Sequence, residues 1–106
     1  MSQQRWVRAL ALADFPSKNI IGLPIEGKRY VFCRVGDAIY AADDACTHQF
    51  ARLSEGELED CLIECPVHYA RFDMRTGVRT YGPVNRNLQT YPTKLDGGQI
   101  YIALSD

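Results

Sequence analysis

The stretch Cys46-Thr47-His48 is followed, after residues 49–64, by Cys65-Pro66-Val67-His68. Both histidines of the 106-residue chain belong to these two pairs. The intervening segment is long enough for two loops that approach each other from a connecting hairpin. Thiolate and imidazole are ligands for iron–sulfur clusters, zinc or copper, whereas Mg²⁺ and Ca²⁺ take oxygen ligands. The candidate ligands of one metal centre are therefore Cys46, His48, Cys65 and His68.

The distribution of these residues over two loops distinguishes iron from zinc. Two Cys and two His also satisfy a tetrahedral structural Zn²⁺ site, so ligand type alone leaves zinc open. Zinc fingers usually take two Cys from one knuckle and two His from a helix. Here each loop contributes one Cys and one His, so each loop could give its Cys to one iron and its His to a second. We favour a two-iron centre and keep a structural zinc-binding interaction module as the alternative.

The remainder of the sequence is typical of an all-β protein. Apolar residues alternate or form short runs, and no segment sustains a long helical stripe. We expect one hairpin from residues 28–35 and 38–42 around Gly36-Asp37, and another from residues 88–95 and 99–104 around residues 96–98. A short helical turn is expected near residues 12–16.

The segment 43–87 is dense in turn residues and contains three of the four cysteines and both histidines. Short strands are expected at residues 58–65 and 69–72, with a turn at residues 73–77. The chain shows no internal repeat, low-complexity stretch or linker. We therefore expect one domain, residues 1–106, in which approximately residues 43–87 form a cluster-binding subdomain inserted into a basal β domain.

Composition and charge restrict the class of protein. The chain is 46% hydrophobic and 24% charged, as in ordinary globular proteins. A formal net charge of −1 gives no bulk attraction to phosphate backbones, so no nucleic acid partner is expected. The first ten residues lack the apolar core of a signal peptide, and no stretch approaches the roughly 20 apolar residues of a membrane span. We expect a cytoplasmic protein without a membrane partner, in which Cys33 and Cys61 are buried free thiols.

The two pairs resemble the CxH and CxxH motifs of Rieske ferredoxins, and the resemblance covers nearly the whole chain. The segments IECPVHYARFDMRTG (63–77), Gly82-Pro83 and LQTYPTKLDGGQIYI (88–102) resemble the ferredoxin components of bacterial aromatic-ring-hydroxylating dioxygenase systems. The resemblance implies a Rieske fold, an antiparallel β sandwich or barrel-like base with an inserted cluster-binding subdomain. It also implies one Rieske-type [2Fe–2S] cluster per chain, with Cys46 and Cys65 on one iron and His48 and His68 on the other.

The function implied by this resemblance is electron transfer without catalysis. Such ferredoxins carry one electron at a time from a flavin-containing ferredoxin reductase to a terminal oxygenase, and we expect a monomer. The chain is too short for the mononuclear iron domain of the oxygenase or for flavin and nicotinamide sites. A second alternative is the small Rieske-like subunit of a nitrite reductase. In the family, a loop that here comprises Gly82, Pro83 and Val84 covers the cluster.

Two departures from the family pattern lie beside the ligands. The family usually has Gly after each ligand histidine, whereas Gln49 and Tyr69 stand there in this chain. Tyr69 could shield the cluster, touch a docking partner, or pack in the core. Ala70 and Phe72 occupy the places where high-potential Rieske proteins usually have Ser and Tyr that donate hydrogen bonds to sulfur. Rieske centres have potentials of roughly −150 to +300 mV, and we predict one at the low end.

Charged residues are unevenly distributed around the second pair. Acidic residues precede it and basic residues follow it: Glu55, Glu57, Glu59, Asp60 and Glu64, then Arg71, Arg75, Arg79 and Arg86. These groups are either two docking patches or ordinary solvated faces.

Overall fold

The computed structural model describes residues 4–45, 51–66, 69–82 and 86–105. Within these ranges the protein is all-β, as predicted, with three antiparallel sheets and two short 3-10 helices. The elements are β1 (Gln4–Ala11), η1 (Leu12–Asp14), β2 (Ile20–Ile25), β3 (Lys28–Val35), β4 (Ala38–Asp43), η2 (Leu53–Glu55), β5 (Glu57–Glu59), β6 (Leu62–Glu64), β7 (Arg71–Asp73), β8 (Arg79–Tyr81), β9 (Thr90–Tyr91), β10 (Thr93–Asp96) and β11 (Gln99–Ser105). None of the helices in these ranges has the length and apolar character needed to cross a membrane.

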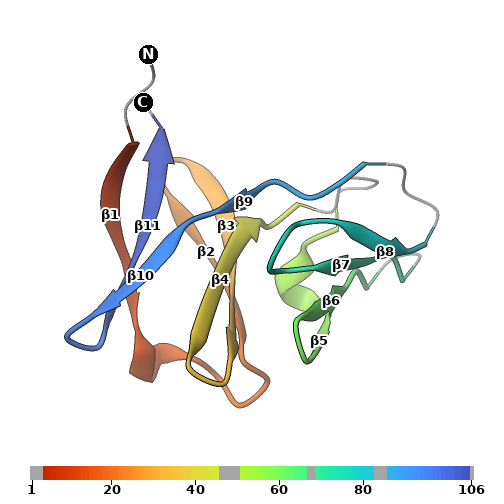
Figure 1. The fold of residues 1–106 in the computed structure, drawn as a ribbon, viewed down its shortest axis with the longest axis horizontal. Helices are drawn as coiled ribbons and strands as arrows, with labels where there is room; N and C mark the ends of the chain where they lie inside the picture. Colours follow the sequence, from red (N-terminus) through yellow and green to blue (C-terminus); the bar gives the residue numbers. More distant parts are fainter. Residues whose placement is uncertain (1–3, 46–50, 67–68, 83–85, 106) are drawn as a thin grey trace.

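Two of the sheets form the base of the molecule. One has the strand order β1-β11-β10 and the other β2-β3-β4-β9. They lie side by side (Figure 1), and their apolar side chains form a shared core. This core consists of apolar side chains from both sheets: Leu10, Ile25, Tyr30, Phe32, Ala41, Ile100, Ile102 and Leu104. The first and last of these strands, β1 and β11, pair with each other. The base is therefore closed by the two ends of the described chain.

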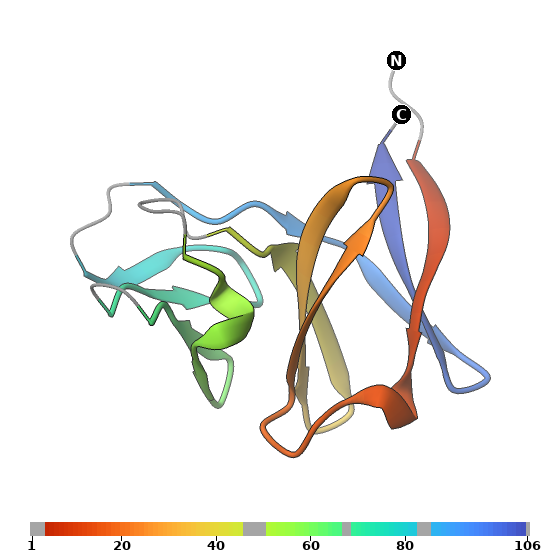
Figure 2. The ribbon, with the colours of Figure 1, turned by 180° about the vertical axis from the view of Figure 1, so that it is seen from behind.

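The third sheet, β5-β6-β7-β8, forms a lobe together with η2, beside the base (Figures 1 and 2). Its core joins side chains of the lobe to side chains of β2, β3 and β4. Strand β3 is buried on both faces, because Phe32 belongs to the core of the base while Val31 and Cys33 belong to the core of the lobe. This explains the continuous apolar run at residues 30–33, since a strand covered on both sides has no solvent face to alternate with.

The first predicted hairpin is confirmed, whereas one arm of the second is wrong. Strands β3 and β4 pair on either side of Gly36-Asp37. Residues 88–95, however, do not form one strand, because β9 and β10 belong to different sheets. They are separated by Pro92, which lacks the N–H that a strand interior needs, while its carbonyl accepts a hydrogen bond from Ala103 N at 3.0 Å. The chain crosses from one sheet to the other at this proline.

The segment 58–65 is also not one strand. It contains nearly all of a hairpin, β5 and β6, that turns at Asp60-Cys61, where Asp60 has a φ of +53°. Asp tolerates this left-handed conformation better than most residues. The strand expected at residues 69–72 begins later, at Arg71, because Tyr69 has a φ of +58°. The predicted turn after Asp73 and the helical turn near residue 12 are both present.

Candidate metal centre

Cys65 is the one predicted ligand that lies within the described residues; Cys46, His48 and His68 lie outside them. Cys65 follows β6 directly and is completely buried. Its backbone N–H donates to the carbonyl of Ala70 at 2.8 Å, just before β7 begins. This bond closes the connection between β6 and β7 and places Cys65 at the end of the lobe sheet.

Tyr69 occupies an unusual backbone conformation on this loop. Its φ of +58° lies in the left-handed region, which costs a non-glycine residue roughly 1–2 kcal/mol. The side chain is 63% exposed, so the alternative that Tyr69 packs in the core is wrong. Gln49, the other departure from the family pattern, lies outside the described residues. The loop therefore keeps a costly conformation and presents an aromatic ring at the surface.

Gly82 makes close contact with the same loop. Its φ is +108°, and a Cβ at this position would lie 2.6 Å from Ala70 Cα. A side chain would therefore push the two segments apart. The Gly82 carbonyl accepts a hydrogen bond from Arg79 Nη1 at 3.1 Å. Of the predicted covering loop, Pro83 and Val84 lie outside the described residues, but its first residue passes directly against the second ligand loop.

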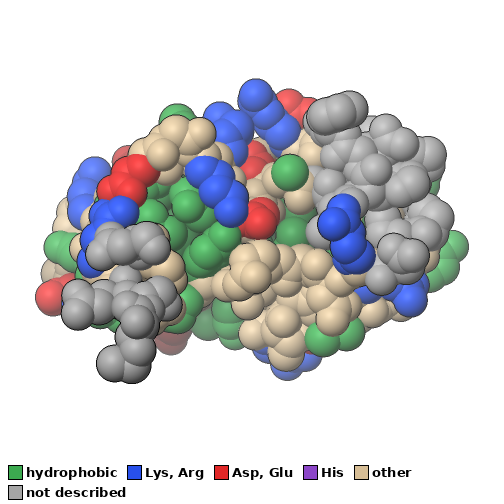
Figure 3. Space-filling model, turned by 90° about the horizontal axis from the view of Figure 1, so that it is seen from above, with side chains coloured by type: hydrophobic (Ala, Val, Ile, Leu, Met, Phe, Trp, Pro, Cys, Tyr) green, Lys and Arg blue, Asp and Glu red, His purple; other side chains and the backbone are tan. Residues whose placement is uncertain are grey.

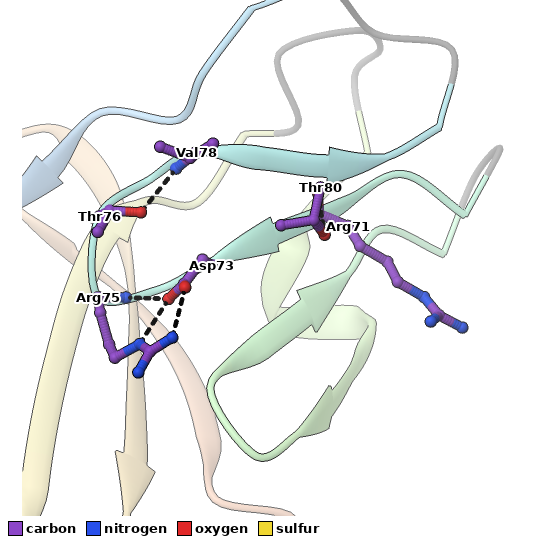
Figure 4. A network of polar contacts seen from close by, with 6 residues as sticks. All are labelled: Arg71, Asp73, Arg75, Thr76, Val78 and Thr80. Carbon is purple, nitrogen blue, oxygen red and sulfur yellow. Dashed lines mark hydrogen bonds and ion pairs between the residues drawn. The ribbon is translucent and has the colours of Figure 1, made fainter.

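The turn that leads to β8 is fixed by a local polar network (Figure 4). Asp73 accepts hydrogen bonds from the backbone and the guanidinium of Arg75 at 2.8–3.1 Å. These contacts lower the pKa of Asp73. Thr76 Oγ1 accepts from Val78 N at 3.2 Å, and Gly77 N donates to Asp73 O at 2.6 Å. The network defines the β7–β8 hairpin, which brings Gly82 to the ligand loop.

A buried carboxylate holds the base of the first ligand loop. Asp44 is 1% exposed and accepts three hydrogen bonds: from Ser54 N at 2.7 Å, Ser54 Oγ at 2.9 Å and Arg29 Nε at 3.2 Å. Its carbonyl accepts from Leu53 N at 2.7 Å. The next residues on each side, Ala45 and Arg52, form an antiparallel bridge. The two segments that flank residues 46–50 are thus joined, and we call Asp44, Ser54 and Arg29 the loop anchor.

The loop anchor requires space on the neighbouring strand β2. A Cβ at Gly22 would lie 2.5 Å from Ser54 Oγ and 2.6 Å from Asp44 Oδ2. No side chain larger than hydrogen fits there without displacing the anchor. This arrangement was not predicted from the sequence. The available signal was an acidic residue, Asp44, two positions before Cys46, but its partners lie on distant segments.

A second contact joins the end of β4, where the chain leaves the base for the lobe, to β9, where it returns. Tyr91 OH, on β9, donates to Asp43 Oδ1 at 2.6 Å, and Lys28 Nζ lies 2.9 Å from the same oxygen. The hydrogen bond to Tyr91 and the contact with Asp43 raise the pKa of Lys28. Seen from above, basic and acidic side chains lie beside apolar surface on the base (Figure 3). The chain thus leaves the base and returns to it at points that share one carboxylate.

The buried Cys33 thiol is poorly suited to bind metal. Burial, with a smaller contribution from Asp44, raises the pKa of the Cys33 thiol to about 12, so this thiol is protonated at neutral pH. Cys33 is buried, as predicted. Cys61 was also predicted to be buried, but it is only half-buried, at the β5–β6 turn. Cys65 differs from both because it lies on a loop beside the second histidine in the sequence. The thiolate and imidazole donors of the two pairs fit an iron–sulfur cluster.

Known proteins match this chain over nearly its whole length. The family model described as "Rieske [2Fe-2S] domain" matches residues 5–92. The chain is 43% identical over 102 residues to the ferredoxin component of the naphthalene 1,2-dioxygenase system of Pseudomonas aeruginosa, covering 96% of this chain and 98% of that protein.

Solved ferredoxin structures have the same fold. The ferredoxin of carbazole 1,9a-dioxygenase from Nocardioides aromaticivorans IC177 superposes with a TM-score of 0.86 at 31% identity, covering 92% of this chain and 95% of that one. A chain from a complex of reduced oxygenase and oxidized ferredoxin in carbazole 1,9a-dioxygenase superposes with a TM-score of 0.85 at 34% identity, covering 92% of each chain.

The fold, the buried thiol on the β6–β7 loop and these matches show that the chain belongs to the Rieske [2Fe–2S] domain family. Within the family it is the ferredoxin component of an aromatic-ring-hydroxylating dioxygenase system, an electron carrier with a Rieske-type cluster. This assignment decides against the nitrite reductase subunit and the structural zinc module.

Proposed function

We propose that Cys46 and Cys65 bind one iron of the cluster and that His48 and His68 bind the other. The proposal is supported by the burial of Cys65 on a loop that contains the second pair, and by the loop anchor, which closes the base of the loop containing the first pair. The cluster, when bound, supplies a one-electron redox couple. Neutral imidazoles in place of two thiolates remove negative charge, so an added electron is easier to accept.

Contacts made by residues outside the proposed ligand set hold the ends of both ligand loops. The Asp44 carboxylate joins the segments on either side of the first loop, while the Cys65–Ala70 hydrogen bond and the contact of Gly82 hold the two ends of the second. Ala70 and Phe72 are completely buried, and their side chains carry no hydrogen-bond donor. Fewer donors near the sulfurs stabilise the reduced, more negative state less. We therefore expect a potential at the low end of the Rieske range of roughly −150 to +300 mV, which voltammetry would measure.

We further propose that the ferredoxin accepts electrons from a flavin-containing reductase and delivers them to a terminal oxygenase. This is supported by a similar chain being described in a complex of oxygenase and ferredoxin. The single-domain organisation with a cluster-binding subdomain at about residues 43–87, the monomeric state and the cytoplasmic location remain predictions. Limited proteolysis, size-exclusion chromatography and cell fractionation would test them in that order.

The experiment that tests the ligand assignment is electron paramagnetic resonance of the dithionite-reduced protein, purified without oxygen. We expect a rhombic signal of the Rieske type, with two irons and two acid-labile sulfides per chain. Cys65→Ser should abolish the signal, whereas Cys33→Ser, which changes a buried thiol outside the proposed ligand set, should retain it. A chain with one zinc and no signal would contradict the electron-carrier assignment.

A further inference from the structure

A row of four side chains crosses the outer face of the lobe sheet. The strand registers place Glu57 opposite Glu64, Glu64 opposite Arg71, and Arg71 opposite Tyr81. On the other face of the same strands, Leu58, Ile63 and Phe72 contribute to the core of the lobe. Because side chains alternate between faces, the four residues of the row share the surface that faces away from this core.

Charge is not balanced along this row. Arg71 Nε lies 2.7 Å from Glu64 Oε2, and the Arg71 guanidinium lies 5.8 Å from the centre of the Tyr81 ring. Figure 4 shows the Arg71 side chain extending away from β7. Glu57 and its neighbour on the same face, Glu59, form no ion pair or hydrogen bond within the described part of the chain. Glu57 instead faces the like charge of Glu64, an arrangement that destabilises a sheet. The fold thus retains the exposed Glu57 carboxylate, which reduces its stability, beside the exposed carboxylate of Glu59, which lies opposite Leu62.

The row lies along two neighbouring hollows, which we together call the groove. One hollow of about 260 Å³ is lined by Glu57, Glu59, Leu62, Glu64 and Arg71, and an adjoining hollow of about 410 Å³ by Glu64, Tyr69, Arg71 and Tyr81. The shared pair Glu64–Arg71 joins the two hollows. Tyr69 and Tyr81 are 63% and 62% exposed, and they lie on the ligand loop and directly before Gly82, respectively. The groove therefore runs from the acidic edge strand β5 to aromatic side chains beside the second ligand loop.

We propose that this groove is a docking surface for a redox partner protein that presents lysine or arginine side chains beside its electron-exchange site. The inference rests on the proposed electron-carrier function. A basic side chain at Glu57 and Glu59 would pair the two carboxylates and relieve the repulsion between Glu57 and Glu64. At the other end the exposed tyrosines supply apolar contact area with a polar tip, as is frequent at protein interfaces. Charge complementarity of this kind mainly increases the rate of association.

The test measures electron transfer from the reduced holoprotein to two acceptors by stopped flow. Cytochrome c is a basic redox protein, and ferricyanide is a small anion that needs no docking surface. The variant Glu57→Gln/Glu59→Gln removes two charges from the groove. The control Asp37→Asn/Asp96→Asn removes two charges from exposed positions on the base.

We expect the groove variant to reduce cytochrome c at least about five-fold more slowly than wild type at low ionic strength, because steering charges change association rates by factors of about ten or more. The difference should disappear near 1 M salt, where the Debye length is about 3 Å. The control variant should change the rate less than about two-fold. Tyr81→Ala should lower the rate at both salt concentrations, because it removes contact area and not charge.

Glu57→Gln should also raise the Tm, since it removes the like-charged cross-strand pair. A slower reaction in a more stable protein would exclude unfolding as its cause. Equal effects of the groove and control variants, or a lower Tm for Glu57→Gln, would overturn the docking proposal. Failure of the wild-type protein to reduce either acceptor would instead contradict the electron-carrier function on which it rests.

Discussion

Replacement of Asp44 by Asn tests whether the buried carboxylate holds the first ligand loop. Three donors, at 2.7–3.2 Å, point at this side chain. An amide retains one acceptor oxygen but directs its NH₂ group toward Arg29 or Ser54, so one donor loses its acceptor and the other bonds lose the charge. A hydrogen bond to a charged group contributes about 1.5–3 kcal/mol and a neutral one about 0.5–1.5 kcal/mol. We therefore expect Asp44→Asn to cost about 2–4 kcal/mol.

For a domain of this size, a loss of that magnitude lowers the Tm by about 8–16 °C, at about 4 °C per kcal/mol. Scanning calorimetry of the anaerobic holoprotein would measure it, with absorbance in the visible range reporting loss of the cluster. Asp73→Asn is the matched control, because its carboxylate also accepts hydrogen bonds from an arginine, but from one whose side chain is 59% exposed, and such exposed pairs contribute at most about 1 kcal/mol. A Tm for Asp44→Asn within about 4 °C of wild type would refute the anchor.

Three further outcomes follow from the geometry. Gly22→Ala should lower the free energy of unfolding by about 1–3 kcal/mol through overpacking, since the new Cβ would lie 2.5 Å from Ser54 Oγ. A Tm equal to that of wild type would show that β2 can shift to accommodate the methyl group. Gly82→Ala should accelerate cluster loss to an iron chelator, because its Cβ would meet Ala70 Cα. Gly97→Ala should not, since that position also has a positive φ but no neighbour within 4 Å. The raised pKa of Cys33 means that the unfolded chain releases the thiol proton near pH 9 while the folded chain keeps it to about pH 12. Stability should therefore fall as the pH rises above 9, and thermal scans of Cys33→Ala should show a shallower decline than wild type.

The parts of the structure that depend on local signals could be predicted from the sequence. The β3–β4 hairpin follows from two β-rich runs around Gly36-Asp37, and the candidate ligands follow from residue types that carry their own chemistry. The division at Pro92 could not be predicted in the same way. Which sheet residues 90–91 join depends on tertiary contacts, including the hydrogen bond of Tyr91 to Asp43.

The loop anchor shows the same limit at the site. Asp44 lies two positions before Cys46, but its function depends on Ser54 beyond the loop and on empty space at Gly22 of another strand. No periodic pattern links these three positions, because they meet through the fold and not through a repeat along one element. The hairpin at Asp60 was similarly obscured, since apolar residues on both sides of the turn make residues 58–65 look continuous.

The pairing of β4 with β9 has a consequence for engineering, because it determines where the lobe could be exchanged. Ala42 and Thr90 are directly paired, with the whole lobe between them in sequence. Cross-strand partners lie about 5 Å apart, so the lobe is a single insertion into the base, and its two ends lie next to each other. Lengthening such an insertion adds little to the entropic cost of closing it. The lobe should therefore be transferable to a base of different sequence, provided that the ladder at Ala42 and Thr90 is retained together with the base residues that contact the lobe: Ile20, Val31 and Cys33 in its core, and Gly22 and Arg29 at the loop anchor.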